Sequence, residues 1–316
     1  GGIRVATLAW WPGNIPAGKI NTEPSQFHDW MPTFADLGGI AAPARTDGVS
    51  LRPRLTGKGE AAASQIYVEY SQNGSTPKYE DFSPSHRGKK RGQMQVVHLD
   101  GFKGVRVNIK SHNDPFQIFD LKKDPKEQHN LADTNPRFKQ LEKRMRDHVL
   151  QSRMPNASAK RPYDNVAIPA AKVSEASPGL KWSFYEGDFP YVPKTSGMKP
   201  QKTGTSANID AAELPAGKGA IQWTGWIDVP ETGTYQMTLS TSSKAFLRIH
   251  QASVLDADFG YQAGQRRSVS IKLAKGYHPI QLTCLSDGQT PPILDWKWGR
   301  SANELTSIED KSLFRK

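Results

Sequence analysis

The first thirteen residues, GGIRVATLAWWPG, begin with a run that is apolar on both alternating faces and end in a turn sequence. Ile3, Val5 and Leu8 stand among further apolar residues, which is typical of a strand covered on both faces within an α/β sheet. Trp11-Pro12-Gly13 should end this strand, because proline removes a ladder donor and glycine permits the turn. A doubly covered strand needs neighbouring elements, so we expect its sheet partners to lie in chain that precedes Gly1.

The remainder of the first half carries the patterns of a small α+β unit. Apolar residues at helical spacing from Phe27 to Leu37 predict an amphipathic helix that faces the core, with Asp29 as its cap. Alternating runs predict four strands of one small antiparallel sheet, over residues 65–70, 93–98, 102–109 and 116–121. A closing helix should start at Pro136, with an apolar face formed by Phe138, Leu141, Met145 and Val149.

The second half has a different pattern. Four prolines punctuate residues 152–179, which predicts a semi-rigid linker over residues 155–178. Residues 179–316 then contain strand-like runs broken by Gly, Pro and Asp turns, which predicts an all-β sandwich. The expected fold is therefore an α+β domain over residues 1–154, a proline-rich linker and a β-sandwich.

Several motifs of the first half occur together in a recognisable order: GGIRV followed by WWPGNIPAGKI, then HDWMPTFADLGGI, DGVSL and IFDLKKDPKEQHNLA. In this, the chain resembles the C-terminal third of a formylglycine-dependent sulfatase of the alkaline-phosphatase superfamily. The resemblance covers residues 1–154. It implies a four-stranded sheet with one helix beside the mouth of an active site, and a parent enzyme that hydrolyses sulfate esters or sulfamates on sugars.

The second half has a resemblance of its own. The segment GWIDVPETGTYQMTLSTSSKAFLRIH, followed by GYHPIQL, is similar to the protective-antigen-type sugar-binding module, over Ser177 to Gly299. Calcium-dependent members of that family carry paired aspartates after this hairpin, where this chain has Ser242-Ser243-Lys244. Since calcium takes six to eight oxygen ligands and a lysine opposes it, we expect no metal site here, and Asp256 with Asp258 are too few to make one.

The charge of the chain is uneven. The net charge is +11, and residues 1–170 hold 25 Lys and Arg against 17 Asp and Glu, or +8. An excess of this kind implies an anionic partner, such as a sulfated polysaccharide, a nucleic acid or a membrane surface. No window approaches the roughly 18 apolar residues of a membrane span, and the basic residues lack the aromatic interleaving that organises nucleic-acid contacts.

The basic residues concentrate in a long polar stretch, residues 71–92, whose SHRGKKRG sequence starts at Ser85. Loops of this length are usually functional or mobile, and a solvated charge cluster is the alternative. From the sulfatase resemblance, we predict that the loop and its flanking strands contact the substrate through five residues: His86, Arg87, Gln95, His98 and Arg106. Arg87 is preferred to Lys89 and Lys90 because its planar fork can bind a sulfate bidentately.

The catalytic motifs of a sulfatase do not occur in this sequence. Such an enzyme needs a cysteine in a C-x-P-S-R context, converted to formylglycine, and aspartates that hold a divalent cation, calcium by resemblance. Cys284 is the only cysteine, stands in LTCLSDG, and is expected to be a small core residue. We therefore predict no catalytic and no metal-binding residue in this chain, no activity of the chain alone, and a catalytic part with both cofactors that precedes it.

The prediction for function is thus the C-terminal portion of a sulfatase that acts on sulfated glycans. The resemblance places the parent in the periplasm or outside the cell. Two alternatives stay open at this point: a stand-alone glycan-binding protein, and a basic protein that binds polyanions or nucleic acid. The upstream coding sequence would discriminate them, because a C-x-P-S-R motif a few hundred residues earlier would establish the enzyme.

Overall fold

The structure is a computed structural model that describes residues 3–212, 214 and 217–316. It consists of two compact units, each formed from separate stretches of the chain. Unit 1 runs to Phe34 and also includes Gly48–Val149 and Pro155–Val166. Unit 2 comprises Ala35–Asp47, Leu150–Met154 and Ala167–Lys316. The predicted linker, residues 155–178, is thus divided between the two units.

The strand predicted at the start of the chain is absent from the structure. Gly1 and Gly2 lie outside the described residues, and Ile3 to Trp10 are irregular, with Leu8 90% exposed. A strand needs a hydrogen-bonded neighbour, and none of the strands in the described ranges pairs with this run. The prediction of a buried strand from Ile3 to Trp10 is therefore wrong for this structure, because apolar alternation cannot form a strand without a partner.

The helix predicted near Phe27 forms, but it buries a different face. A 3₁₀ turn, η1 (Phe27–Asp29), leads into α1 (Trp30–Leu37), and a second short helix, α2 (Arg52–Thr56), follows. Phe27 and Phe34, expected in the core, are exposed, whereas Asp29 and Thr33 are fully buried. The expectation of a core-facing apolar stripe was wrong, because polar bonds fix this segment.

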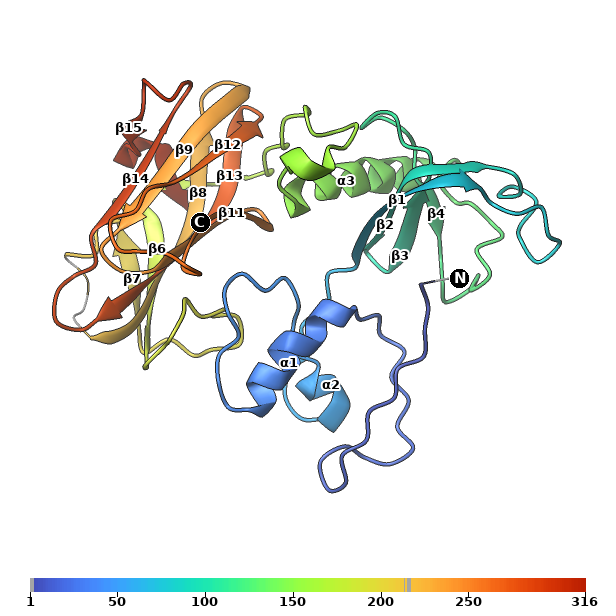
Figure 1. The fold of residues 1–316 in the computed structure, drawn as a ribbon, viewed down its shortest axis with the longest axis horizontal. Coiled ribbons are helices and arrows are strands. Elements are labelled where there is room, and N and C mark those ends of the chain that lie inside the picture. The colour runs from blue at the N-terminus through green and yellow to red at the C-terminus, as the bar shows by residue number, and fades with distance from the viewer. Residues whose placement is uncertain (1–2, 213, 215–216) are drawn as a thin grey trace. The chain divides into compact units, whose positions relative to one another are not determined.

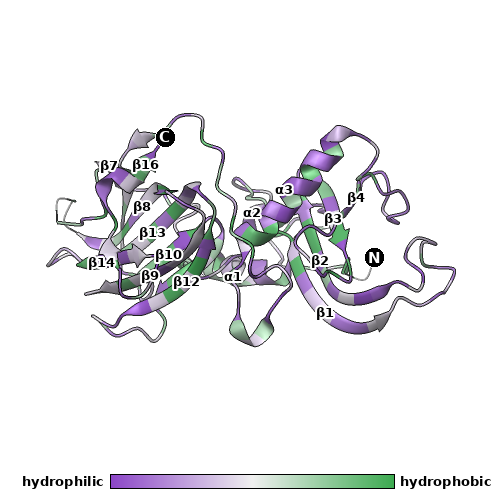
Figure 2. Ribbon diagram, turned by 90° about the horizontal axis from the view of Figure 1, so that it is seen from above, coloured by the Kyte–Doolittle hydropathy of each residue, from purple (hydrophilic) through white to green (hydrophobic). Residues whose placement is uncertain are grey.

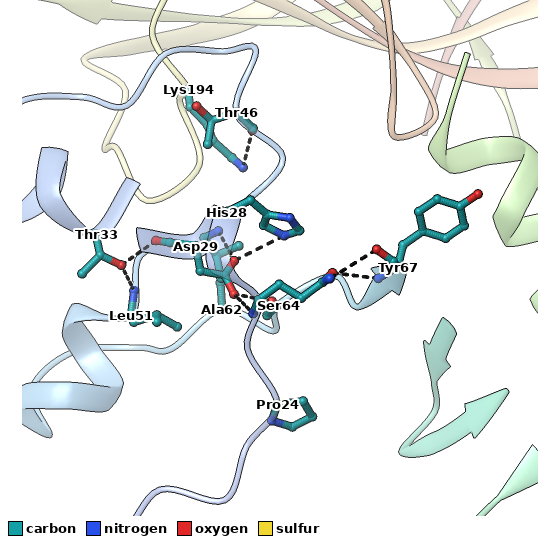
Figure 3. A network of polar contacts seen from close by, with 12 residues as sticks. Pro24, His28, Asp29, Thr33, Thr46, Leu51, Ala62, Ser64, Tyr67 and Lys194 are labelled. Carbon is teal, nitrogen blue, oxygen red and sulfur yellow. Dashed lines mark hydrogen bonds and ion pairs between the residues drawn. The ribbon is translucent and has the colours of Figure 1, made fainter. Parts of the chain in front are cut away.

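These polar bonds converge on two side chains of the segment (Figure 3). The Asp29 carboxylate accepts hydrogen bonds from the backbone of Val49, at 2.9 Å, and from the Ser64 hydroxyl, at 2.5 Å. The Thr33 hydroxyl accepts from the Leu51 backbone at 2.8 Å. Asp29 therefore links α1 to the chain that leads into the first strand, rather than simply capping the helix.

The predicted four-stranded antiparallel sheet is confirmed, in the order β1-β2-β3-β4 (Figure 1). Its strands are β1 (Tyr67–Ser75), β2 (Lys90–Leu99), β3 (Phe102–Arg106) and β4 (Gln117–Phe119). The first two strands are longer than predicted and form an extended hairpin. Much of the stretch expected to be a loop, residues 71–92, is therefore strand, and only residues 76–89 connect the two strands; we call these residues the hairpin tip.

The closing helix is α3 (Pro136–Ser152), and it covers the sheet as its sequence predicts (Figure 2). Leu141, Met145 and Val149 are buried on its apolar face. The contact with the sheet is close at Gly104 of β3, where an added Cβ would lie 2.5 Å from the Met145 sulfur. No helix in the described part of the chain is long and apolar enough to cross a membrane.

Unit 2 is a β-sandwich, as predicted. One sheet has the order β11-β10-β13-β8-β16-β5, with β6 also paired with β8 and β7 paired with β6, and the other has the order β12-β9-β14-β15. The strands are β5 (Ser177–Pro178), β6 (Leu180–Glu186), β7 (Lys202–Ser206), β8 (Lys218–Val229), β9 (Gly233–Thr241), β10 (Ala245–Ile249), β11 (Ala252–Ala257), β12 (Arg267–Leu273), β13 (Gly276–Asp287), β14 (Leu294–Gly299), β15 (Thr306–Ser307) and β16 (Leu313–Arg315). The predicted fold class, an α+β domain joined to an all-β sandwich, is confirmed.

The core of the sandwich is made by alternate residues of its long strands. Trp223 of β8 and Trp296 of β14 are fully buried, together with Met237 of β9. Cys284 on β13 is also fully buried, and burial raises the pKa of its thiol. The expectation that Cys284 is a small core residue is therefore confirmed.

Candidate functional site

The β1–β2 hairpin carries the residues predicted to contact substrate. Along β2 the buried positions alternate at Gln93, Gln95 and Val97, so that two amides occupy the covered face of the strand. A buried amide needs hydrogen-bond partners, because an unmet donor or acceptor in the interior costs about 1–3 kcal/mol. The partners of these two glutamines form a polar cluster inside unit 1.

Arg106 is the charged member of this cluster, and its exposure is only 3%. It stands opposite Gln95 in the β2–β3 register, and its Nε donates to Gln95 Oε1 at 2.7 Å. One terminal nitrogen donates to the carbonyls of His112 and Asp114, at 2.8 and 2.9 Å. Burial lowers the pKa of Arg106 to about 10, so the guanidinium remains charged at neutral pH.

The cluster extends from Gln95, whose exposure is 1%, to neighbouring side chains. Gln95 Nε2 contacts the Tyr67 hydroxyl at 3.3 Å and Glu69 Oε1 at 3.4 Å. Gln93 Nε2 donates to the same Glu69 oxygen and to the Tyr163 hydroxyl, both at 3.2 Å. The structure thus brings two predicted site residues, Gln95 and Arg106, together, and both are directed into the interior.

The second pair of predicted residues, His86 and Arg87, lies in the hairpin tip. His86 Nε2 is 2.9 Å from Gln117 Oε1 on β4, which attaches the tip to the sheet. Arg87 donates from Nε to the Phe82 carbonyl and from NH2 to the Glu80 carbonyl, each at 2.8 Å. Two arms of its planar fork therefore bind backbone of the tip.

His98, the fifth predicted residue, lies near the end of β2. Its backbone N–H donates to the Ile66 carbonyl at 3.0 Å, and its ring is half-buried. Burial, together with the nearby Lys103, lowers the pKa of His98 to about 4. Lys103 itself is buried in an ion pair with Glu127 at 2.6 Å. At neutral pH His98 is thus an uncharged donor or acceptor, and the substrate role of all five residues stays a prediction.

Two aromatic residues of the hairpin tip were not among the predicted contacts. Tyr79 is 66% exposed and Phe82 38% exposed, and their ring centroids are 6.4 Å apart at an interplanar angle of 35°. Both are surrounded in sequence by lysine, arginine and acidic residues. Two aromatic residues three positions apart in an otherwise polar stretch are the signal that could have indicated them.

In unit 2, the segment of residues 41–47 docks on the sandwich. The Ala44 N–H donates to the Val192 carbonyl at 2.8 Å, and the Lys194 N–H donates to the Ala42 carbonyl at 2.6 Å. The Ala44 methyl is buried in a small apolar cluster with Val192. Backbone bonds and apolar burial together make this segment part of the sandwich unit.

The same segment brings a cation to the acidic residues of β11 and the turn after it. Arg45 NH2 lies 2.8 Å from Asp256 Oδ2, and its guanidinium stacks on the Phe259 ring at 4.6 Å. Lys244 Nζ lies 3.4 Å from Asp258 Oδ1. The two carboxylates nearest to the expected position of a calcium site thus each have a basic partner from this chain.

The residues that the structure describes do not fit the cofactors of a sulfatase. The thiol that would have to become formylglycine, that of Cys284, is fully buried and has a raised pKa. Asp256 and Asp258 are paired with basic side chains, and the described residues contain no cluster of three or more His, Cys, Asp or Glu able to hold a metal ion. No catalytic step is therefore assigned to this chain.

Comparison with protein families gives a match for each half of the chain. The family described as N-sulphoglucosamine sulphohydrolase, C-terminal, matches residues 1–155. The PA14 domain family matches residues 176–311. The two matches follow one another along the chain, and their families are those that the sequence resembles.

Curated relatives match the first half. An ulvan-active sulfatase of Formosa agariphila is 29% identical over 161 residues, which cover 46% of this chain and 32% of that protein. Human steryl-sulfatase is 31% identical over 162 residues, which cover 46% of this chain and 27% of that protein. The chain thus spans about a third of the length of these relatives.

Solved structures match the second half. A PA14 sugar-binding domain from an RTX adhesin is 12% identical and is covered to 99%, against 44% of this chain, with a TM-score of 0.37. The PA14 domain of the MpAFP antifreeze protein is 15% identical and is covered to 94%, against 46% of this chain, with a TM-score of 0.38. By the two family matches, the chain joins a region similar to the sulfatase C-terminal domain, over residues 1–155, to a region similar to the PA14 domain, over residues 176–311.

Proposed function

We propose that this chain is the substrate-recognising C-terminal part of a sulfatase, a sulfuric ester hydrolase, that acts on sulfated sugars or polysaccharides. The observation that carries the proposal is the β1–β2 hairpin of the sulfatase-type region, which is basic at and beside its tip. Residues 76–91, which comprise the hairpin tip and the first two residues of β2, hold five Lys and Arg against two Asp and Glu. A locally positive surface of this kind attracts a chain of sulfate groups and raises its association rate.

The chemistry of ester hydrolysis belongs, in this proposal, to a catalytic part of the parent protein outside this chain. That part would supply the formylglycine nucleophile and the divalent cation, by analogy with the sulfatases. Val5, Leu8 and Trp10 are large, exposed apolar side chains near one another in sequence, and exposed apolar groups of this size commonly contact another protein surface. They are the residues we assign to contact with the catalytic part.

The PA14 domain is assigned a glycan-binding role in the same parent protein. An enzyme with a separate binding module gains avidity for a polymeric substrate. Once the module has bound the polymer, binding of the same polymer chain at the active site is intramolecular. Sulfated polysaccharides lie outside cells, so the parent is proposed to act in the periplasm or extracellularly.

The first test is binding of the chain to dextran sulfate and to neutral dextran of the same length, by titration calorimetry at two salt concentrations. We expect dextran sulfate to bind at least tenfold more tightly and to weaken as salt rises, because ion pairs with sulfate are screened. Equal binding of the two polymers, or no binding of either, would contradict the proposal.

A basic protein can bind any polyanion, so the test needs a matched control. Replacing Lys89 and Lys90 of the hairpin by serine removes two charges from the proposed site. Replacing Lys122 and Lys123, two exposed residues of the same unit, removes the same charge elsewhere. We expect the first double variant to lose at least fivefold in affinity and the second less than twofold. Equal losses would show that only the net charge matters.

A further inference from the structure

We infer that the hairpin tip holds a sugar-binding platform made by Tyr79 and Phe82. This inference rests on the proposed function. It assigns the contact with the saccharide ring to two residues that are not among the five substrate contacts predicted from the sequence. Their rings are exposed, 6.4 Å apart and inclined by 35°. The electron-rich face of an aromatic ring attracts the polarised C–H groups on the apolar face of a pyranose. Two inclined rings at this spacing offer a shallow surface for one sugar ring.

The tip is held in one conformation by bonds of its own. The Thr76 N–H donates to the Lys89 carbonyl and the Gly88 N–H donates to the Thr76 carbonyl, both at 2.9 Å, so the base of the tip is closed. The Phe82 N–H donates to the Tyr79 carbonyl at 3.2 Å, which makes a tight turn between the two aromatic residues. This turn places the two aromatic residues at its two ends.

Arg87 completes this arrangement as a positioning residue. Its guanidinium donates to the carbonyls of Glu80 and Phe82, the residues directly within and at the end of the aromatic turn. His86, its neighbour, contacts Gln117 of β4 and packs edge-on against Phe119. The tip is therefore ordered before a ligand arrives, and a pre-organised site avoids the entropy cost of ordering on binding.

The charges of the tip favour a sulfated saccharide over a nucleic acid. Lys78, Lys89 and Lys90 are exposed cations near the aromatic turn and can pair with sulfate groups. Glu80 and Asp81, between the two aromatic residues, are acceptor-only carboxylates that suit the hydroxyl donors of a sugar. A DNA backbone offers no hydroxyl donors to these carboxylates, whereas a sugar with free hydroxyls does. The site thus combines hydroxyl acceptors, cations and an aromatic surface.

The test uses the whole chain with both aromatic residues replaced, Tyr79→Ala and Phe82→Ala, against dextran sulfate. We expect the double variant to lose at least fivefold in affinity, while its thermal midpoint stays unchanged because both side chains are exposed. The conservative pair Tyr79→Phe and Phe82→Tyr keeps both ring faces and should bind within twofold of the wild type. Tyr70→Ala, an exposed aromatic residue on β1 outside the tip, is the control and should also remain within twofold.

A separate variant, Arg87→Lys, tests the positioning role of Arg87, because lysine keeps the positive charge but lacks the planar guanidinium. We expect a loss of affinity of at least threefold together with an altered near-ultraviolet circular dichroism of the tip aromatics, which a purely electrostatic role would not change. If the wild type binds dextran sulfate and the double aromatic variant binds it with the same affinity, the platform is overturned and the proposed function stands. Absence of wild-type binding would overturn both. Preferential binding of single-stranded DNA, lost in the double variant, would overturn the saccharide as the ligand.

Discussion

Arg106 holds the buried polar cluster of unit 1 together. Its side chain bonds Gln95 and two backbone carbonyls, and it stacks on the Phe116 ring at 4.5 Å. A buried cation is tolerated only where hydrogen bonds and nearby negative charge compensate its lost hydration. Burial lowers the pKa of Arg106, and the nearby carboxylates of Asp114 and Glu142 raise it, so these two carboxylates supply part of the compensating negative charge. The cluster is therefore a unit whose members depend on one another.

The first prediction follows from this dependence. Arg106→Leu should lower the free energy of unfolding by about 3 kcal/mol or more, because the Gln95 side chain and two backbone carbonyls lose their donor in the interior. Urea denaturation monitored by tryptophan fluorescence would measure the change. Lys123→Leu, an exposed substitution in the same unit, should stay within about 0.5 kcal/mol. A similar small effect for Arg106→Leu would show that the cluster contributes little to stability.

Unit 2 contains a histidine pair that should make its stability depend on pH. His250 Nε2 lies 2.9 Å from His278 Nδ1, and His278 Nε2 donates to the Ala274 carbonyl at 2.8 Å, so the pair fits two neutral rings. Burial and the neighbouring ring lower the pKa of His250 to about 3 from 6.5, and burial also lowers the pKa of His278. The unfolded chain, with ordinary imidazoles, therefore binds more protons than the folded chain below pH 6.5.

The two neutral histidines contribute their full stabilisation of the folded state above about pH 6.5. This stabilisation is lost as the pH falls towards 3. His250→Asn should make the free energy of unfolding less steep between pH 4 and 6, by up to about 1.4 kcal/mol per pH unit, since one proton fewer is taken up. Asparagine also tolerates the left-handed backbone at this position, where φ is 54°. Identical pH profiles of variant and wild type would contradict this account.

At the scale of elements, α3 and the small sheet meet at a position that admits no side chain. A Cβ on Gly104 would lie 2.5 Å from the Met145 sulfur and 3.1 Å from the Phe116 ring. Gly104→Ala should therefore destabilise the chain by about 1–3 kcal/mol through overpacking. Gly101→Ala is no control for this change, because φ at Gly101 is 81° and any side chain there is strained.

The cause can be separated by a second change. In Gly104→Ala combined with Met145→Ala, the added methyl has room, so the pair should be more stable than the sum of the two single changes predicts. Denaturation curves of the three variants would give the coupling free energy. Strict additivity would show that α3 does not meet the sheet at Gly104.

The acidic residues of β11 and its following turn should leave unit 2 independent of calcium. Asp256 is paired with Arg45 and Asp258 with Lys244, so neither carboxylate is available to a divalent cation without loss of an ion pair. We expect the thermal midpoint of the chain to change by less than about 2 °C between excess calcium and chelator, since an unbound ligand cannot stabilise the folded state. A rise of many degrees with calcium would show that these residues hold the ion.

The elements differ in how far the sequence alone determines them. The four strands of the small sheet, α3 and the sandwich strands have clear periodicity, and each of them has its packing partner within this chain, so pattern and structure agree. The run from Ile3 to Trp10 has equally clear alternation, but no partner among the described residues, and it forms no strand. Periodicity indicates which face of a segment is apolar, but the segment forms a strand only where a neighbouring element pairs with it.

The candidate site shows a similar limit at finer scale. Gln95, His98 and Arg106 were chosen as polar residues on or beside the hairpin, but strand alternation and register direct Gln95 and Arg106 towards each other and into the interior. Bonds of Arg87 to carbonyls of its own loop depend on the loop conformation, which no local pattern encodes. The sequence could indicate a basic hairpin, but which of its side chains face the interior and which are exposed follows only from the three-dimensional structure.

At the scale of the whole molecule, the chain combines two regions with different folds, to which the proposed function assigns different tasks. The sulfatase-type region presents a basic hairpin. The PA14-type domain is a β-sandwich that lies outside the part of the chain matched by the sulfatase relatives. Neither region holds a thiol or carboxylate cluster suited to ester hydrolysis in its described residues. Recognition and chemistry are thus proposed to reside in different parts of one parent protein.

Release of inorganic sulfate tests this division most directly. It would be measured by ion chromatography for the purified chain and for the full-length parent protein, with dextran sulfate and a small aryl sulfate as substrates. We predict no turnover by the chain alone, because a positioned substrate without a nucleophile or metal reacts no faster than in water, and turnover by the parent. Chelator-insensitive sulfate release by the chain alone, or no release by the parent on any sulfated substrate, would contradict the account.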